Sequence, residues 1–310
     1  MKALVTGGAG FIGSAVVAVL ARRGHEVTVF DNLTSGHRRN LDPGVPFVEG
    51  DIRDAHALIR ALRGTDVVFH LAASVGNKRG LENPTNDASV NAIGTLNVLE
   101  AARITDCKKV VYSSSAAIYG ETVQLPVEED QPKRPLTPYA ISKLAGENYV
   151  LAYSALYGIE GICLRYFNVY GEGQRFDAYG NVIPIFVTNA LEGKTLTIYG
   201  DGEQTRDFVN IADVAEANLR AGEASGVSGA FNVGSGSATT INEVATLIVD
   251  SCPKKVGITH GPPRAGDVRH SRADISSASG SLGYRPAVAL QSGLNRYVEW
   301  ARAEARSASG

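Results

Sequence analysis

The 310-residue chain has little cysteine, and nothing in its arrangement suggests a disulfide framework or a metal site. Its three cysteines, Cys107, Cys163 and Cys252, are odd in number and form neither a CxxC pair nor a cluster with histidine. This pattern argues against a disulfide-stabilised secreted domain. We therefore expect a reduced, cytoplasmic setting and no bound metal.

An excess of charge of one sign is also lacking. The 30 basic and 32 acidic side chains give a net charge of −2, and both signs are scattered along the chain. Without a basic stripe the chain has no electrostatic footprint for nucleic acid, so we expect no nucleic-acid partner. Hydrophobic residues make up 44% of the sequence, which is enough for a sizeable core in one large or two modest domains.

A long uncharged stretch runs from Ala3 to Ala21 and is followed by Arg22 and Arg23. A signal peptide or a membrane anchor could have this pattern. Glycines near its start would break the apolar helix, however, and a strand-like segment ending in Asp31 follows directly. We therefore predict no membrane association.

The N-terminus instead contains a glycine-rich turn between a predicted strand at residues 3–6 and a predicted helix at about 11–23. Gly7, Gly10 and Gly13 have the spacing GxxGxxG, which lets backbone N–H groups approach a pyrophosphate at a helix N-terminus. Asp31 ends the next strand, where a carboxylate accepts hydrogen bonds from a ribose 2′-OH and repels a 2′-phosphate. An ordinary glycine turn is the alternative, but the combination favours NAD over NADP.

Tyr139 and Lys143 lie four residues apart in a predicted helix, so their Cβ atoms are about 5–6 Å apart on one face. A tyrosine that acts as a base near neutral pH needs its pKa lowered by roughly 3 units, or about 4 kcal/mol. A neighbouring lysine and a bound nicotinamide cation could supply this stabilisation. Taken alone, the pair would more often be a packed phenol beside a lysine that reaches solvent. The glycine turn in the same domain favours proton transfer.

Strand-like and helix-like segments alternate up to about residue 170, which predicts an α/β fold with a doubly wound, Rossmann-type parallel sheet. We predict an NAD-binding domain at residues 1–168, with 212–235 packing back on it, and a smaller C-terminal α/β substrate lobe at 169–310. The cleft between them should lie at the carboxyl ends of the strands. Helices are expected at 83–105, at a capping box that starts at residue 240, and at 290–305.

The segments TGGAGFIG, GDIRD, HLAA, YSSSAAIYG, YAISK and RYFNVYG, in this order and spacing, resemble the extended short-chain dehydrogenase/reductase family, in its nucleotide-sugar branch. The resemblance covers nearly the whole chain. It implies that Ser115 hydrogen-bonds the reacting sugar hydroxyl, that Tyr139 is the base, and that Lys143 holds the nicotinamide ribose. The full set of cofactor contacts that it implies is Gly7, Gly10, Phe11, Ile12, Gly13, Asp31, Asn32, Asp51, Ile52, Leu71, Ala72, Ala73, Asn91, Ser113, Tyr139, Lys143 and Tyr166. Asp51 and Ile52 would flank the adenine, and Tyr166 would line the nicotinamide pocket.

Within this branch, two alanines reduce the number of reactions that the chain could catalyse. Dehydratases of the branch carry Thr-Asp-Glu where this chain has Ser115-Ala116-Ala117, and the removal of water needs an acid and a base there. Asn168 in RYFN resembles the hexose 4-epimerases, because the uronic-acid enzymes typically have threonine. The resemblance therefore implies an NAD-dependent isomerase, a UDP-hexose 4-epimerase. A UDP-glucuronate or dTDP-sugar 4-epimerase, a nucleotide-sugar reductase or dehydratase, and a non-catalytic NAD-sensing regulator stay open as alternatives.

The same resemblance implies substrate contacts and an assembly. Fixed cations should anchor the diphosphate while the sugar turns. The implied substrate residues are Ser115, Asn168, Asn181, Arg206, Arg264 and Ser271. A small residue such as Ser271 goes with acceptance of N-acetylated sugars, whereas a bulky aromatic goes with plain hexoses. A homodimer is expected through a four-helix bundle of the 83–105 helix and the helix that carries Tyr139. His70, His260 and His270 are expected to be structural.

Overall fold

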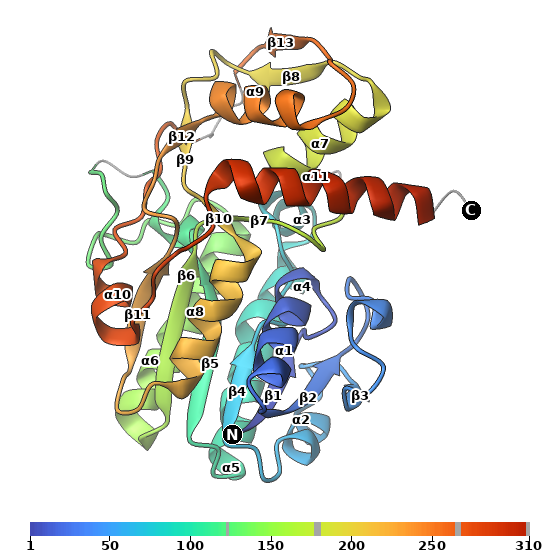
Figure 1. Ribbon diagram of the computed structural model, residues 1–310. Coiled ribbons are helices and arrows are strands. Elements are labelled where there is room, and N and C mark those ends of the chain that lie inside the picture. The colour runs from blue at the N-terminus through green and yellow to red at the C-terminus, as the bar shows by residue number, and fades with distance from the viewer. Residues whose placement is uncertain (122–123, 177–180, 264–267, 308–310) are drawn as a thin grey trace.

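A computed structural model describes residues 1–121, 124–176, 181–263 and 268–307 (Figure 1). Its centre is a parallel sheet of seven strands in the order β11-β6-β5-β4-β1-β2-β3. The strands are β1 (Lys2–Thr6), β2 (Glu26–Asp31), β3 (Phe47–Glu49), β4 (Val67–His70), β5 (Lys109–Ser115), β6 (Glu160–Tyr166) and β11 (Gly229–Val233). The predicted fold class, a doubly wound parallel sheet, is confirmed.

Helices cover both faces of the sheet, so its strands are apolar on both sides. In β1, Ala3 and Val5 pack into the cluster on one face, and Leu4 packs into the cluster on the other. The first face carries α1 (Phe11–Arg22), α8 (Ile211–Glu223) and α10 (Ser276–Leu282), and the second carries α2 (Ala55–Ala61), α5 (Gly94–Ile104) and α6 (Pro138–Tyr157). Figure 1 shows α1 and α8 in front of the sheet.

The smaller lobe lies over the carboxyl ends of the strands, at the top of Figure 1. It has its own hydrophobic cluster, which includes Phe186, Ile248 and Tyr297. Its elements are α7 (Val182–Glu192), the parallel pair β8 (Leu196–Tyr199) and β13 (Ile258–Gly261), α9 (Ile241–Ser251) and α11 (Leu290–Ser307). The expected capping box starts α9: Thr240 Oγ1 accepts from the Glu243 N–H at 3.1 Å, and Glu243 Oε2 accepts from the Thr240 N–H at 2.8 Å.

Two pairs of short strands lie between the large sheet and the smaller lobe. They are β7 (Asn168–Tyr170) with β10 (Phe208–Asn210), which are parallel, and β9 (Thr205–Arg206) with β12 (Thr239–Thr240), which are antiparallel. The segment 161–171, which reads as one strand in the sequence, is therefore divided between two sheets. The division falls at Phe167, because its side chain packs in a separate cluster with Ile118 and Val127 while β7 leaves to pair with β10.

The helix predicted at 83–105 is also divided. It consists of α4 (Pro84–Ala88), a π-helical turn η2 (Ser89–Ile93) and α5, and it is preceded by α3 (Asn77–Glu82). Such π-turns are frequent at functional sites. Two 3-10 turns, η1 (Arg38–Asn40) and η3 (Ala116–Tyr119), complete the described elements. Within the described ranges, we find no helix with the length and apolar character that a membrane crossing requires.

Candidate active site

The glycine turn after β1 has a shape that larger residues would obstruct. Gly7 has φ +70°, and a Cβ there would lie 2.5 Å from the Ala72 nitrogen, in the segment that follows β4. A Cβ on Gly13 would lie 2.1 Å from the Gly7 carbonyl oxygen. Gly10 is the N-cap of α1 and makes no side-chain cap, so the first N–H groups of this helix are left to a ligand. A diphosphate fits this turn.

Asp31 is buried at the carboxyl end of β2, where backbone donors hold its carboxylate. Oδ2 accepts from the Ala9 N–H at 3.0 Å, and Oδ1 accepts from the Leu33 N–H at 2.8 Å. Each oxygen keeps a further lone pair, so the group can still accept from ribose hydroxyls. The glycine turn and this carboxylate together fit NAD, whose ribose hydroxyls Asp31 would accept from.

Replacing Asp31 with alanine should weaken NAD binding about 10- to 100-fold, since a hydrogen bond to a charged group contributes about 1.5–3 kcal/mol. Loss of the Ala9 contact would weaken NAD and NADP alike, so the ratio of the two dissociation constants isolates the 2′-position. That ratio, measured by titration calorimetry, should move toward one. Equal affinity of the wild type for both cofactors would contradict the role of Asp31.

The adenine side of the expected site is braced by charged groups. Asn32 Nδ2 donates to Asp51 Oδ2 at 3.0 Å, and Arg53 Nη2 lies 2.6 Å from the same oxygen. The hydrogen bonds from Arg53 hold the pKa of the Asp51 carboxyl well below its usual range. Ile52 is buried beneath Gly94, where a Cβ would lie 2.5 Å from its Cδ1. Asp51 is thus a fixed carboxylate next to a buried isoleucine.

Asn91 lies in the π-turn η2 and ties the segment after β4 to the catalytic helix. Its Oδ1 accepts from the Ser74 N–H at 2.8 Å, and its Nδ2 donates to the Ser74 carbonyl at 2.9 Å and to Ser142 Oγ at 3.0 Å. Both amide hydrogens are used in this way. Asn91 therefore fixes the backbone that follows Leu71, Ala72 and Ala73, beside the expected cofactor.

Ser115, Tyr139 and Lys143 come together at the carboxyl end of β5. Ser115 is the last residue of β5, and its side chain hydrogen-bonds Tyr139. Tyr139 lies in the first turn of α6, which begins at Pro138 after the Thr137 cap. Lys143 is one turn later and 2% exposed, with Nζ 4.4 Å from the centre of the Tyr112 ring. The structure thus brings together the three residues that the sequence predicts as a proton-transfer site.

The surrounding protein shifts the pKa of Tyr139 upward, opposite to the lowering that the sequence analysis expected for a base. Burial raises the pKa of Tyr139, and the hydrogen bond with Ser115 opposes this. Burial also lowers the pKa of Lys143 to about 7, against the nearby carboxylates of Asp87 and Glu147. The net effect of these groups is to raise the pKa of Tyr139, so a role as base would need a further positive charge near the phenol.

Asp87 is a neighbour of this pair that sequence reasoning missed. It is 1% exposed in α4, and its Oδ1 accepts a short hydrogen bond from Ser142 Oγ. Its Oδ2 has no hydrogen-bond partner among the described residues. A Cβ on Gly80 would lie 3.3 Å from this oxygen and 3.0 Å from the Tyr139 nitrogen, so Asp87 is close to the catalytic helix. The sequence signal that could have indicated Asp87 is its position one helical turn before Asn91, a predicted cofactor contact.

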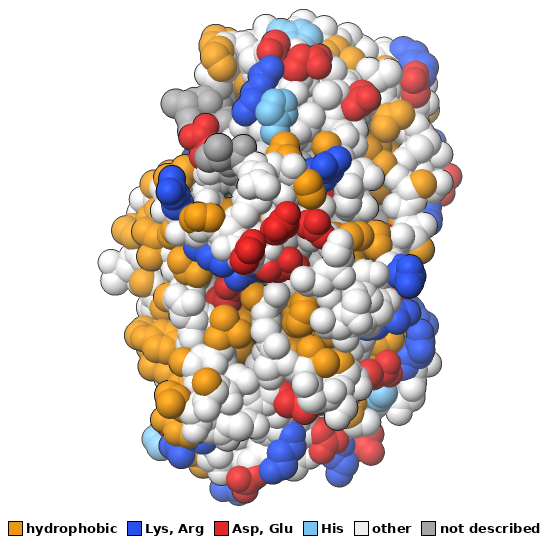
Figure 2. All heavy atoms as spheres, turned by 90° about the vertical axis from the view of Figure 1, so that its left-hand side faces the viewer, with side chains coloured by type: hydrophobic (Ala, Val, Ile, Leu, Met, Phe, Trp, Pro, Cys, Tyr) orange, Lys and Arg blue, Asp and Glu red, His pale blue; other side chains and the backbone are white. Residues whose placement is uncertain are grey.

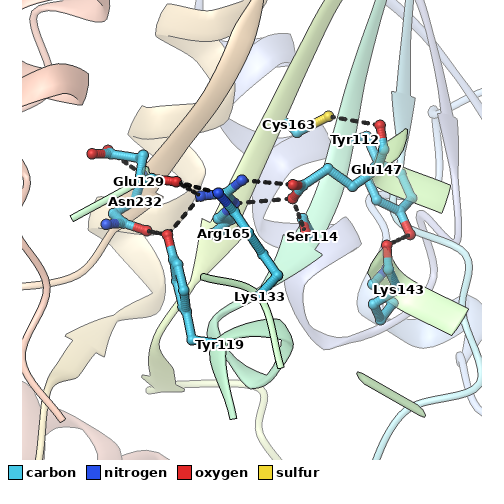
Figure 3. Close-up of polar contacts among 10 residues, drawn as sticks. All are labelled: Tyr112, Ser114, Tyr119, Glu129, Lys133, Lys143, Glu147, Cys163, Arg165 and Asn232. Carbon is cyan, nitrogen blue, oxygen red and sulfur yellow. Dashed lines mark hydrogen bonds and ion pairs between the residues drawn. The ribbon is translucent and has the colours of Figure 1, made fainter. Parts of the chain in front are cut away.

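A buried ion pair lies one turn beyond Lys143 and was also missed (Figure 3). Glu147 and Arg165 are 1% and 4% exposed, and two contacts of 2.7 and 3.0 Å join them. Ser114 Oγ donates to Glu147 Oε2 at 2.6 Å, so this serine is structural. Arg165 Nη1 also donates to the Tyr119 hydroxyl at 2.6 Å. The pair thus connects α6 with β5 and β6 directly behind the catalytic residues.

Tyr166 is buried and Ser113 is half-buried at neighbouring strand ends. Tyr166 is 5% exposed, and its hydroxyl is 3.0 Å from Asn218 Oδ1 of α8 and hydrogen-bonds Ser113. Its hydroxyl is therefore held within the protein, and contact with a cofactor would involve its ring. His70 is buried between Thr6 Oγ1 at 2.7 Å and Thr95 Oγ1 at 2.9 Å, and burial lowers its pKa to about 3. It is a neutral structural residue.

The expected substrate residues lie where the small strand pairs meet. The Asn168 N–H donates to the Asp207 carbonyl at 2.9 Å, and the Thr205 N–H donates to the Arg269 carbonyl at 3.0 Å. These backbone contacts bring Asn168, Arg206 and the segment that leads to Ser271 close together between the sheet and the smaller lobe. Asn168, Arg206 and Ser271 are all half-buried. Asn181 is exposed at the N-cap of α7. Arg264 lies outside the described residues.

Asp207 holds this layer together, although no sequence motif indicated it. It is fully buried, and its carboxylate accepts from the Ser235 and Gly236 N–H groups at 2.6 and 3.0 Å and from the Ala273 N–H at 3.0 Å. Burial raises its pKa, and these hydrogen bonds oppose the rise. The segment that bears Ser271 is thus fixed two residues downstream, at Ala273.

The rest of the described surface shows neither a basic patch on the face of Figure 2 nor a metal site. Figure 2 shows Lys and Arg dispersed among acidic side chains over the face seen from the left of Figure 1. In the described part of the chain, no group of three or more His, Cys, Asp or Glu is arranged to hold a metal ion. The three cysteines are buried free thiols.

Comparison with known proteins places this geometry in a family. The model of the NAD-dependent epimerase/dehydratase family matches residues 3–234. A putative UDP-glucose 4-epimerase of Methanocaldococcus jannaschii is 42% identical over 299 residues, 96% of this chain and 97% of that protein. A UDP-glucose 4-epimerase of Thermus thermophilus, solved in complex with NAD, is 40% identical with a TM-score of 0.90 and covers 97% of this chain and 99% of its own.

A UDP-N-acetylglucosamine 4-epimerase of Methanobrevibacter ruminantium, in complex with UDP-N-acetylmuramic acid, is 35% identical with a TM-score of 0.94 and covers 98% of both chains. These matches confirm the expected NAD cofactor and an isomerase of the UDP-glucose 4-epimerase kind. From its sequence and its fold, the chain belongs to the NAD-dependent epimerase/dehydratase family.

Proposed function

We propose that the protein interconverts the C4 epimers of UDP-hexoses, UDP-glucose with UDP-galactose and UDP-GlcNAc with UDP-GalNAc, through a transient 4-keto sugar. The observation that carries the proposal is the meeting of Ser115, Tyr139 and Lys143 at the carboxyl end of β5, in the same parallel sheet whose first strand leads into the glycine turn. Ala116 and Ala117 follow Ser115 in η3, so the acid and base that a dehydration needs are lacking at these two positions.

The side chains divide the chemistry between them. Tyr139 accepts the proton of the C4 hydroxyl, and Ser115, which hydrogen-bonds Tyr139, orients that hydroxyl. NAD, when bound, supplies a reversible hydride acceptor for C4. In its protonated form, Lys143 favours the phenolate that takes the proton. After the sugar has turned, Tyr139 returns the proton, and no net oxidation results.

The turn of the sugar requires a nucleotide that stays fixed. We assign this anchoring to Arg206 with Arg264, and we assign contacts to the sugar or diphosphate to Asn168 and Asn181. Arg206 is half-buried at the layer between the lobes, where its Nη1 donates to the Thr205 carbonyl at 2.8 Å. A guanidinium held in this way can bind two phosphate oxygens without a large loss of side-chain entropy.

The function is tested by incubating the purified protein with UDP-galactose, UDP-GalNAc and UDP-galacturonate in the absence of any added reductant. We expect UDP-glucose and UDP-GlcNAc as products, with little conversion of the uronate. A dTDP-galactose sample tests the choice of nucleotide. Appearance of a 4-keto-6-deoxy sugar, or conversion of the uronate alone, would contradict the proposal.

Ser271 sets the breadth of substrates in this proposal. It is half-buried between Arg269, which pairs with Asp201 at 2.7 Å, and Ala273, which bridges to Val127. A serine there leaves the volume of an aromatic ring for an acetamido group. Ser271→Tyr should therefore reduce UDP-GalNAc epimerisation at least ~10-fold and spare UDP-galactose, because steric exclusion acts on one substrate only.

Both rates are measured on the wild type, on Ser271→Tyr and on Ser271→Ala as a control for loss of the hydroxyl. Equal effects of the tyrosine on both substrates, or a wild type that ignores N-acetylated sugars, would refute the gatekeeper role.

We also propose a homodimer, through a four-helix bundle of α5 and α6 with their symmetry mates. Large apolar side chains are exposed on these helices: Ile104 is 52% exposed on α5, and Ile141 and Leu156 are 56% and 72% exposed on α6. Figure 2 shows hydrophobic side chains gathered along one edge of the molecule. Exposed apolar patches of this kind favour association.

Light scattering at micromolar concentration should return about twice the 32.7 kDa of one chain. Leu156→Glu should shift the mass toward the monomer, because a charge cannot be buried there unpaired. A wild-type mass near 33 kDa would refute the dimer.

A cytoplasmic setting is the corresponding proposal for localisation. It is supported by the thiols of Cys107, Cys163 and Cys252, which are buried and unpaired. Burial raises the pKa of each thiol, which keeps it protonated and unreactive. Fractionation of cells that express the native chain would test this setting.

A further inference from the structure

The C-terminal helix α11 reaches the cofactor turn through side chains that no sequence motif contains. Glu304, near its end, places Oε1 2.9 Å from both Nε and Nη2 of Arg175. A third contact, of 3.2 Å, joins the same oxygen to Nη2 of Arg39, which lies in η1. Arg175 and Glu304 are 27% and 33% exposed, so this cluster is only partly screened by solvent.

The third guanidinium nitrogen of Arg175, Nη1, contacts a residue that in turn contacts the glycine turn. Arg175 Nη1 donates to Asn40 Oδ1 at 3.0 Å, and Asn40 Nδ2 donates to the Ala9 carbonyl at 2.7 Å. Asn40 uses both ends of its amide in this link, which fixes its orientation. An unbroken series of polar contacts thus connects Glu304 with Ala9, at opposite ends of the chain.

Both backbone polar groups of Ala9, in the glycine turn, are hydrogen-bonded. It is fully buried, its N–H donates to Asp31 Oδ2, and its carbonyl accepts from both Asn40 and the His37 N–H, the latter at 2.9 Å. The carbonyl of Ala9 and the N–H of Gly10 share one peptide plane. The Asn40 contact therefore fixes the peptide that leads into Gly10, the N-cap of α1, where a diphosphate would bind.

The same helix is anchored in the core of the smaller lobe. Leu294, Tyr297 and Val298 are buried in the hydrophobic cluster of that lobe. Figure 1 shows the C-terminal half of α11 above the loop between β2 and β3. Arg175 is thus the junction at which the lobe that we assign to the sugar meets the turn that we assign to the cofactor.

We propose that Glu304, Arg175 and Asn40 form a latch that holds the glycine turn in its cofactor-binding shape and so slows NAD release. These are positioning residues, since they act through Ala9. The inference rests on the cofactor part of the proposed function and is independent of the sugar. An enzyme that oxidises and then reduces one substrate molecule needs its cofactor retained between the two events.

The test is the rate of NAD release from the purified full chain without any sugar present, followed as NAD in the filtrate after rapid dilution. Arg175→Gln and Glu304→Gln should each release NAD about tenfold faster than the wild type. The KM for UDP-galactose should stay within twofold.

Arg296→Gln is the matched control. Arg296 also joins α11 to the segment before Arg175, through Glu172 at 2.9 Å, but this ion pair involves neither η1 nor the glycine turn. It should leave the rate of NAD release unchanged. Wild-type release rates in both latch variants would overturn the proposal, and so would equal acceleration by Arg296→Gln. A wild type that releases NAD slowly but epimerises no UDP-hexose would refute the proposed reaction and leave the latch standing.

Discussion

Tyr139→Phe should lower turnover at least ~100-fold while NAD stays bound, because the ring keeps its packing and only the proton acceptor is lost. The hydroxyl of Tyr139 hydrogen-bonds Ser115 at the end of β5, so its removal also frees that serine. Steady-state turnover of UDP-galactose and the amount of NAD in the purified variant measure the two parts of this prediction.

Tyr149→Phe serves as the control, since it removes a phenol from the same helix at a position that is 38% exposed. Its turnover should match that of the wild type. Near-normal turnover of Tyr139→Phe would show that another group is the base.

Glu147→Gln should destabilise the protein by about 3–5 kcal/mol, since it leaves the Arg165 guanidinium buried without its counter-charge. The two side chains are 1% and 4% exposed, so solvent cannot compensate for the lost carboxylate. For a chain of this size the midpoint of thermal unfolding should fall by roughly 10 °C. Calorimetry of the variant measures this fall.

The double variant Glu147→Gln/Arg165→Met distinguishes the cost of an unpaired charge from the cost of altered side-chain packing. It removes both charges, so most of the lost stability should return. A single variant that unfolds within 2 °C of the wild type would contradict the cost that we assign to the unpaired arginine.

The parts of the site that the sequence predicted are those formed by local geometry. The turn at Gly7 to Gly13 is one strand-to-helix connection, and Tyr139 and Lys143 are one turn apart in one helix. Asp31 needs only the end of the next strand. Periodicity and spacing describe such groups well, because neighbours in the chain are neighbours in space.

The parts that were missed depend on contacts between distant segments. Glu147 and Arg165 each look like ordinary charged residues, and their burial follows only when α6 packs on β5 and β6. Asp207 becomes a buried brace because two segments distant in sequence, at Ser235–Gly236 and at Ala273, donate to its carboxylate. The π-turn at Ser89–Ile93 was also missed, since its apolar spacing differs little from that of an α-helix.

The edge strand β11 has a consequence for how the chain can fold during its synthesis. It pairs with β6 through residues 229–233, although the chain has by then left the sheet to form α7 and β8 of the other lobe. A nascent chain that has emerged only as far as β6 therefore carries an unpaired strand edge, which is a site for incorrect pairing. For the same reason a single cut near residue 168 would not release an intact cofactor domain, because the severed fragment would lack both β11 and α8.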